Sequence, residues 1–68
     1  MAFFKLENYF LAAASYTGAI IQNSTYSQYY TGRGAAYFHL GFSQSEYCSD
    51  FRMACNLGDC DNYNKFCK

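Results

Sequence analysis

Several apolar residue types are scarce or missing in this chain of 68 residues. It has no valine, tryptophan or proline, and only six leucine and isoleucine residues together, against seven phenylalanines and eight tyrosines. Any core must therefore be aromatic. One buried ring covers about 150–250 Å², so a domain this small cannot enclose all of its rings. We expect several of them to face a partner, a membrane interface or another copy of the chain.

Charge is balanced overall and absent from a long segment. Five basic and five acidic residues give a net charge of zero, and no charged residue lies between Glu7 and Arg33. A neutral chain lacks the long-range field that attracts nucleic acid, which argues against nucleic-acid binding. A long uncharged surface tends instead to associate.

The N-terminal 21 residues resemble neither a cleaved leader nor a membrane span. They contain a lysine and an apolar stretch, but Glu7 and Asn8 interrupt the beginning of that stretch, so we expect no cleavable targeting segment. Residues 9–21 are too short to span a membrane, which requires about 20 apolar residues. The segment can still lie on a membrane or under a neighbouring subunit.

Cysteine is absent before Cys48, and all four cysteines lie in the final third of the chain. A chain this short buries too little surface to be stable without a staple, a metal or a partner. An even number of cysteines in a small chain indicates disulfides and therefore an oxidising compartment.

Apolar residues recur at helical spacing near the N-terminus. Phe3, Phe10 and their neighbours predict a helix over residues 3–16, and Gly18 is a suitable place for it to end. Residues 18–22 are compatible with a strand or with continuation of the helix, because short apolar runs do not distinguish the two.

The centre of the chain has the pattern of a β-hairpin. Residues 26–31 and 35–42 flank the tripeptide Gly32-Arg33-Gly34, whose glycines can adopt the positive φ angles of a tight turn. Apolar and other residues alternate along the second segment with a period of two, as in a half-buried strand. We expect Arg33 at the tip of this hairpin, where it can contact a partner.

Two helices are predicted after the hairpin. Ser43 and Glu46 have the spacing of a capping box at the start of a helix over residues 44–56, and Gly58 is placed to end that helix. Residues 60–68 carry acidic residues first and basic residues last, which complements a helix dipole.

Helix geometry determines how the cysteines pair. Cysteines seven residues apart in one helix lie about 10 Å from each other, whereas a disulfide tolerates at most about 7 Å. Across two antiparallel helices, Cys55 meets Cys60 near the turn and Cys48 meets Cys67 at the open end. The remaining pairing needs parallel helices, which a four-residue connection forbids. A zinc site is disfavoured because zinc ligands usually come in pairs two to four residues apart. A redox-active dithiol is also disfavoured, because the sequence contains no CxxC motif.

The cysteine arrangement in residues 45–68 resembles that of helical hairpins with twin Cx9C or Cx3C motifs, found in mitochondrial intermembrane-space proteins and some plant defence peptides. The spacing here is Cx6C, which belongs to neither pattern. The resemblance implies that an uncleaved chain can reach an oxidising space without a signal peptide.

The expected fold is a small disulfide-rich α+β domain, with an N-terminal helix, a β-hairpin and a C-terminal helical hairpin clipped by two disulfides. A mostly α fold is the alternative. We expect one domain over residues 1–68, in which residues 1–42 form an aromatic-rich interaction part and residues 43–68 form the helical hairpin.

No residue has the surroundings of a catalytic or metal-binding group. His39 is the single histidine and lacks a supporting acid or cysteine at a suitable spacing. The serines lack a nucleophile motif, and the cysteines are better explained as bridged. We therefore expect no enzyme activity, no cofactor and no metal. Asn23-Ser24-Thr25 is an N-glycosylation sequon, whose use requires the secretory pathway.

The residues expected to bind a partner are aromatic, with one arginine: Phe3, Phe4, Phe10, Tyr26, Tyr29, Tyr30 and Arg33. For the three tyrosines, packing of the hairpin on the first helix is the alternative. They predict a structural or accessory subunit of a larger, membrane-associated assembly. The partners would be protein subunits or copies of the chain itself, with membrane-interface contact allowed. The alternatives are a secreted effector or defence peptide and a self-assembling filament or coat subunit. The expected location is the mitochondrial intermembrane space or the extracellular space.

Overall fold

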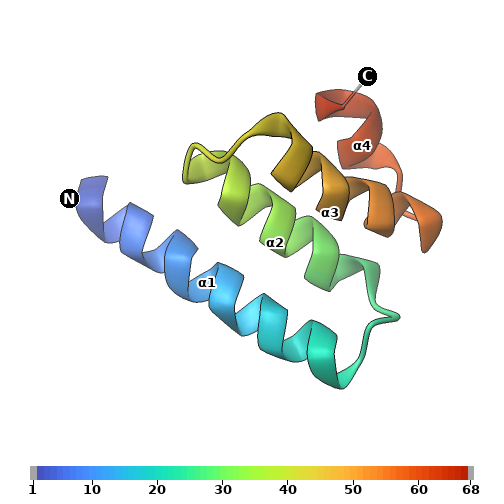
Figure 1. The fold of residues 1–68 in the computed structure, drawn as a ribbon, viewed down its shortest axis with the longest axis horizontal. Coiled ribbons are helices and arrows are strands. Elements are labelled where there is room, and N and C mark those ends of the chain that lie inside the picture. Colours follow the sequence, from blue (N-terminus) through green and yellow to red (C-terminus); the bar gives the residue numbers. More distant parts are fainter. Residues whose placement is uncertain (1, 68) are drawn as a thin grey trace.

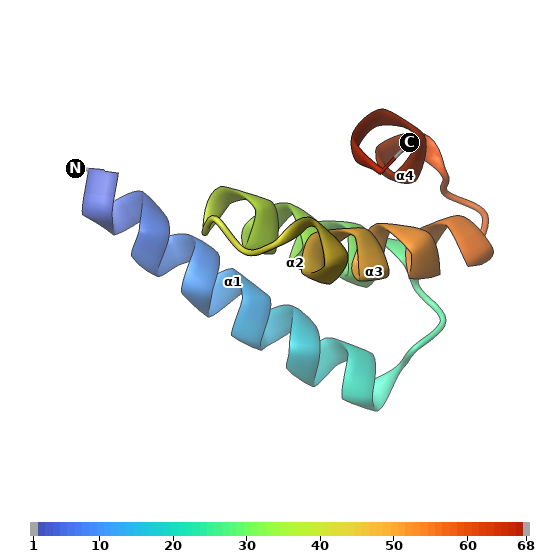
Figure 2. The ribbon, with the colours of Figure 1, turned by 45° about the horizontal axis from the view of Figure 1, so that its top comes forward.

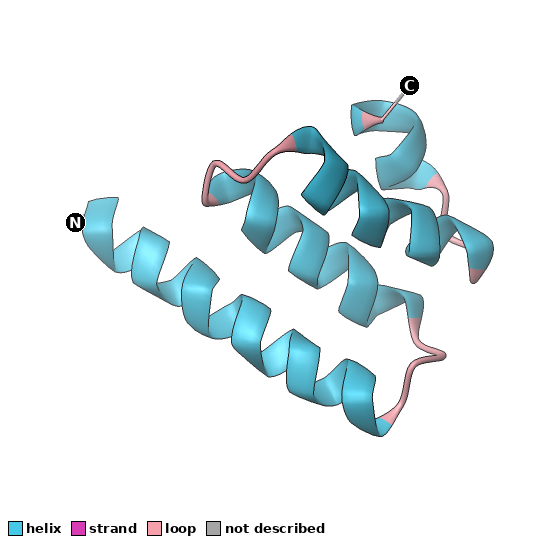
Figure 3. Ribbon diagram, in the orientation of Figure 1, coloured by secondary structure: helices cyan, strands magenta, loops and turns pink. Residues whose placement is uncertain are grey.

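The computed structural model describes the backbone of residues 2–67 and the side chains of residues 8–67. This part of the chain contains four helices: α1 (Ala2–Gln22), α2 (Ser27–His39), α3 (Gln44–Asn56) and α4 (Asp61–Phe66), shown in Figures 1 and 3. The described residues include no β-strand. The predicted α+β fold class and its β-hairpin are therefore wrong, and the mostly α alternative is confirmed.

The first three helices lie side by side, each antiparallel to the next, with α2 in the middle (Figures 1 and 2). α4 packs on α3 and forms the predicted helical hairpin with it. The Cα atoms extend over 35 × 29 × 15 Å, so the molecule is flat. Because α2 separates α1 from α3, the side of α1 that faces away from α2 is left uncovered.

Gly32 and Gly34 lie inside α2, where they let neighbouring side chains approach the backbone. A Cβ atom on Gly34 would lie 2.7 Å from Cε1 of Phe51, and one on Gly32 would overlap the ring of Tyr16. Neither glycine has a positive φ angle. The glycines therefore serve helix packing rather than a turn. The period-two pattern was misleading because α2 is covered by α1 on one side and α3 on the other, which removes the single apolar stripe of a surface helix.

The turn that the sequence predicted in the middle of α2 occurs after it, at Gly41. This glycine has a φ of 82°. Its N–H donates to the carbonyl oxygen of Phe38 at 3.2 Å, and the N–H of Phe42 donates to that of Tyr37 at 3.0 Å. The Phe42 and Tyr37 rings stack with their centroids 4.8 Å apart. These features together form a Schellman motif with its hydrophobic contact.

α3 begins and ends where the sequence predicted, but the predicted capping box at its start does not form. Gly58 has a φ of 110° and ends the helix as expected, and its N–H donates to the carbonyl oxygen of Cys55 at 3.0 Å. At the other end Ser43 is the N-cap, but its side chain makes no capping hydrogen bond. Its Oγ lies 3.2 Å from Oγ of Ser45 instead. The helix start is confirmed, whereas the capping box with Glu46 does not form.

α1 continues past Gly18, which was expected to end it. The helix runs to Gln22, so the open choice for residues 18–22 is resolved as helix. A Cβ atom at Gly18 would meet nothing within 4 Å. Nothing in the described structure therefore requires glycine at this position, and the residue faces open space.

The core is small and its large side chains are aromatic, as the composition indicated. Phe51 is 1% exposed, and its ring stacks on that of Phe66 with centroids 5.6 Å apart. Alanines fill the space between helices that approach closely. The buried apolar residues are Ala13, Tyr30, Ala36, Phe51 and Ala54.

Candidate interaction surface

Two disulfides join α3 to the segment that contains α4. The outer disulfide links Cys48 and Cys67, whose Cα atoms lie 5.8 Å apart, and the inner disulfide links Cys55 and Cys60. This is the pairing that helix geometry predicted. All four thiols are used in these bonds, and within the described residues no group of three or more potential metal ligands comes together.

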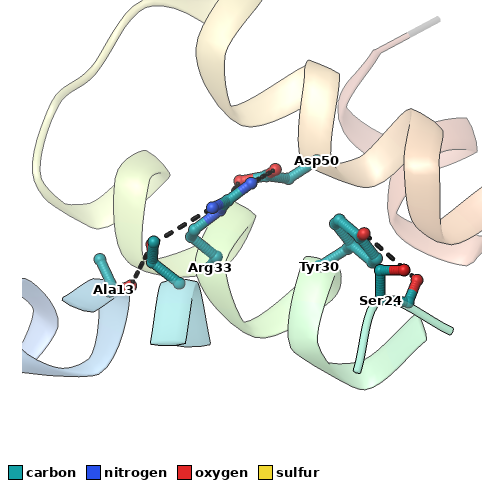
Figure 4. Close-up of polar contacts among 6 residues, drawn as sticks. Ala13, Ser24, Tyr30, Arg33 and Asp50 are labelled. Atoms are coloured by element: carbon teal, nitrogen blue, oxygen red, sulfur yellow. Dashed lines mark hydrogen bonds and ion pairs between the residues drawn. The ribbon is translucent and has the colours of Figure 1, made fainter. Parts of the chain in front are cut away.

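A buried ion pair connects the central helix to α3 (Figure 4). Asp50 is 3% exposed and accepts hydrogen bonds from Nε of Arg33 at 3.0 Å and from Nη2 at 2.7 Å. Nη1 of Arg33 donates to Oγ1 of Thr17 at 3.2 Å, and Oγ1 of Thr17 donates to the carbonyl oxygen of Ala13 at 2.8 Å. The network therefore ties α1, α2 and α3 together.

This network corrects the position predicted for Arg33. The residue does not lie at a hairpin tip but inside the three-helix layer, with its guanidinium also 5.8 Å from the ring centroid of Tyr37. Hydrogen bonding to Asp50 raises the pKa of Arg33, while partial burial acts in the opposite direction. The arginine therefore stays charged and holds the helices in register. No local pattern indicated Asp50 as its partner, because the two residues are distant along the chain.

The three tyrosines predicted to form an interaction patch lie in different environments. Tyr30 is buried, and its hydroxyl donates to the carbonyl oxygen of Ser24 at 3.2 Å. Tyr29 is partly buried, with its ring centroid 5.3 Å from that of Tyr26 and 6.4 Å from that of Tyr16. Tyr26 is exposed. Of the three, Tyr26 therefore has the most surface available to a partner, whereas Tyr30 packs in the core.

The most exposed apolar side chains occur on α1. Phe10 is 63% exposed, Leu11 66% and Ile21 81%. At about 100° per residue, these positions share one side of the helix with two exposed small residues, Ala14 and Gly18. We call these five residues the outer face of α1. It contains no charged or strongly polar side chain.

The opposite side of α1 packs against α2. The ring of Tyr9 stacks on that of His39 with centroids 4.4 Å apart, and Ala13 is buried. Tyr16 covers Gly32. α1 thus has two apolar sides, one used inside the molecule and one open. The sequence prediction included Phe10 but missed Leu11 and Ile21, which a second apolar stripe along residues 10–21 could have indicated. Phe3 and Phe4 were also predicted to bind a partner, but their side chains are outside the part of the chain whose side chains the structure describes.

A shallow groove lies between α3 and α4. Its volume is about 540 Å³, within the range of small-molecule sites. Its two cysteines are bridged, and its described lining residues include no histidine or carboxylate that could activate a serine hydroxyl. The residues that line it are Gln44, Ser45, Cys48, Ser49, Arg52, Tyr63 and Cys67.

Comparison of the chain with protein-family models, with curated proteins and with solved structures found no match. In the part of the chain that the structure describes, no helix has the length and hydropathy required to cross a bilayer.

Proposed function

We propose that this protein is a non-enzymatic structural or accessory subunit that docks onto a larger, membrane-associated assembly through the outer face of α1. The observation that carries the proposal is the exposure of Phe10, Leu11 and Ile21 on one side of α1, in the part of the helix after Glu7 that contains no charged residue. Apolar patches of this kind on small soluble domains mark interaction sites.

The apolar area of this face is large enough to contribute substantially to binding. Complete burial of a Phe, Leu or Ile side chain is worth about 1.5–3 kcal/mol. With exposures of 63–81%, Phe10, Leu11 and Ile21 together would contribute roughly 3–6 kcal/mol on docking. Part of this gain offsets the entropy lost on association, so a stable complex requires further contacts from the partner.

The rest of the molecule supports docking by keeping α1 in place. The ion pair between Arg33 and Asp50 and the hydrogen bond from Arg33 to Thr17 join α1 to the other helices. The two disulfides hold the far side of the layer. A rigid face loses little conformational entropy on binding, which favours affinity.

The disulfides indicate an oxidising compartment. Within that constraint we propose the extracellular space or the mitochondrial intermembrane space, and a partner surface that is itself apolar, because the outer face of α1 offers no charge to pair with.

Sedimentation velocity of the oxidised chain tests whether the face is associative. We expect the isolated chain to self-associate as its concentration rises, because its partner is missing. The double variant Leu11→Lys/Ile21→Lys should remain monomeric with an unchanged circular dichroism spectrum. Met53→Lys, at a side chain of α3 that is 40% exposed, is the matched control and should behave like the parent chain. A parent chain that stays monomeric and binds no apolar dye contradicts the proposal.

Photo-crosslinking in cells that express the chain identifies the partner. A photoreactive amino acid in place of Ala14, at the centre of the outer face, should cross-link to one protein of an assembly. The control carries the same photoreactive amino acid in place of Arg52, which lies in the groove between α3 and α4. This control should not cross-link to that protein. Equal products from both positions would contradict docking through α1.

A self-assembling subunit is a second candidate, supported by the order of side chains on the outer face. Small residues, Ala14 and Gly18, lie between the large residues Leu11 and Ile21. In an antiparallel pair of α1 helices, Ala14 of one copy would oppose Gly18 of the other, and Leu11 would oppose Ile21, as a two-fold interface requires. Cross-links from position 14 to a second copy of the chain would favour this candidate over the accessory subunit.

A further inference from the structure

The loop between α1 and α2 carries a motif that the docking proposal does not use. Asn23, Ser24 and Thr25 form the Asn-x-Thr sequence of an N-glycosylation sequon, and all three residues are exposed. The loop lies at the edge of the helical layer, at the end opposite the α1 N-terminus (Figures 1 and 3). It is the one such motif in the sequence, because none of the other asparagines has serine or threonine two residues later.

The hydrogen bonds of the loop orient the asparagine side chain. Oδ1 of Asn23 accepts from Oγ1 of Thr25 at 2.6 Å and from the N–H of Thr25 at 3.1 Å. The asparagine and threonine side chains of the sequon are therefore directly joined. None of the hydrogen bonds found among the described residues uses Nδ2 of Asn23, the atom to which a glycan is attached.

The disulfides provide an independent reason to consider this modification. They indicate an oxidising compartment, and the lumen of the endoplasmic reticulum, where N-glycosylation takes place, is such a compartment. A chain that forms these disulfides on the secretory route would therefore expose its sequon to the glycosylation machinery.

We propose that Asn23 is an acceptor for an N-linked glycan. In this reaction Nδ2 of Asn23 forms a bond with the anomeric carbon of an oligosaccharide carried on a lipid pyrophosphate. The bond between that carbon and the pyrophosphate oxygen breaks, the lipid pyrophosphate leaves with the electron pair, and Nδ2 loses one proton. The inference does not rest on the docking proposal, and it places the chain on the secretory route rather than in mitochondria.

A glycan at Asn23 also restricts where a partner can dock. Ile21, which is 81% exposed, precedes Asn23 by two residues, and Tyr26, which is 49% exposed, follows it by three. A glycan on Asn23 would therefore lie near these two apolar side chains and reduce the access of a partner to them. Phe10 and Leu11 lie more than two helical turns away along α1 and remain accessible, so docking would use the N-terminal half of the outer face.

The test is the mass of the full chain secreted from animal cells behind a cleavable signal peptide, measured before and after treatment with peptide-N-glycosidase. We expect a glycan mass that the enzyme removes, leaving aspartate at position 23. Asn23→Gln and Thr25→Ala should lack the glycan, whereas Asn62→Gln should keep it, because Asn62 is not in a sequon. Secretion of the parent chain with both disulfides and no glycan would overturn the proposal.

A second measurement covers variants that are not secreted. Translation of the parent chain and of Asn23→Gln in a cell-free system with microsomes shows glycosylation as a slower-migrating band. We expect this band for the parent chain alone. Its absence from translocated parent chain, or its presence in Asn23→Gln, would contradict the assignment of Asn23. Neither result decides whether α1 docks onto a partner, which the sedimentation experiment tests separately.

Discussion

Replacing Asp50 with alanine tests whether the buried ion pair holds the three helices together. The substitution removes both oxygens that accept hydrogen bonds from Arg33. The guanidinium keeps its bond to Thr17, but its charge loses the carboxylate partner. We expect the protein to lose stability because a largely enclosed charge is left without compensation.

The structure allows a rough magnitude for this loss. Removing one partner of a buried ion pair typically costs about 3–5 kcal/mol. The side chain of Arg33 is still 20% exposed, so water can solvate part of the guanidinium and reduce the cost. We expect Asp50→Ala to lower the free energy of unfolding by about 2–3 kcal/mol. A chain of this size has a total of about 3–10 kcal/mol, so the melting temperature should fall by about 10–20 °C.

Urea unfolding of the oxidised protein, followed by circular dichroism, measures the loss. Glu46→Ala is the matched control, since Glu46 is an exposed acid on the same helix and should change stability by no more than about 0.5 kcal/mol. The double variant Arg33→Met/Asp50→Leu removes both charges. Its loss in free energy of unfolding should be smaller than the sum of the losses in the two single variants, since replacing a whole buried pair by apolar residues is often neutral.

Two results would refute this reasoning. If Asp50→Ala destabilised the protein no more than Glu46→Ala, the ion pair would contribute nothing measurable. If the effects of Arg33→Met and Asp50→Leu were additive in the double variant, the two side chains would not be coupled. Either result would mean that packing alone positions α2 against α3.

Gly34→Ala should lower the free energy of unfolding in urea by about 1–3 kcal/mol, because its Cβ atom would overlap the ring of Phe51. Gly18→Ala should raise it by about 0.5–1 kcal/mol, because that site is helical and open. Equal effects of the two variants would contradict the close approach of Phe51 to the backbone at Gly34. Phe51→Ala should lower the free energy of unfolding by about 3–5 kcal/mol. Phe10→Ala, at an exposed site, should lower it by about 0.5 kcal/mol or less. Calorimetry of the two variants measures this difference between a core and a surface position. Replacing the outer disulfide by serines should destabilise by about 1 kcal/mol more than replacing the inner one, because it closes a loop of 19 residues rather than 5; the reverse order in denaturant would show that chain entropy does not dominate.

The second half of the fold was largely predictable because its constraints are local. Cysteines seven residues apart cannot pair within a helix, and Gly58 at the end of α3 adopts the positive φ angle that its position indicated. The same logic failed for the capping box, since the side chain of Ser43 turns to Ser45 instead. For α3, local rules therefore predicted the helix bounds correctly but not the hydrogen bonds of its cap.

The central helix was mispredicted because its determinants are not local. Gly32 and Gly34 look the same in sequence whether they serve a turn or make room for a neighbouring helix. The rings that approach them, from Tyr16 and Phe51, come from α1 and α3. Because these glycines were interpreted as a turn, Arg33 between them was expected at a hairpin tip, whereas it lies in the middle of α2.

The sequence by itself determined the aromatic composition, the uncharged segment, the sequon at Asn23 and the disulfide pairing, because each depends on residue type or on spacing along the chain. The tertiary structure decided what becomes of them. Packing of α2 between α1 and α3 buried Tyr30, partly enclosed Arg33 and left Phe10 exposed. Which of many similar aromatic side chains is left for a partner depends on how helices pack, and that depends on contacts between residues far apart in the sequence.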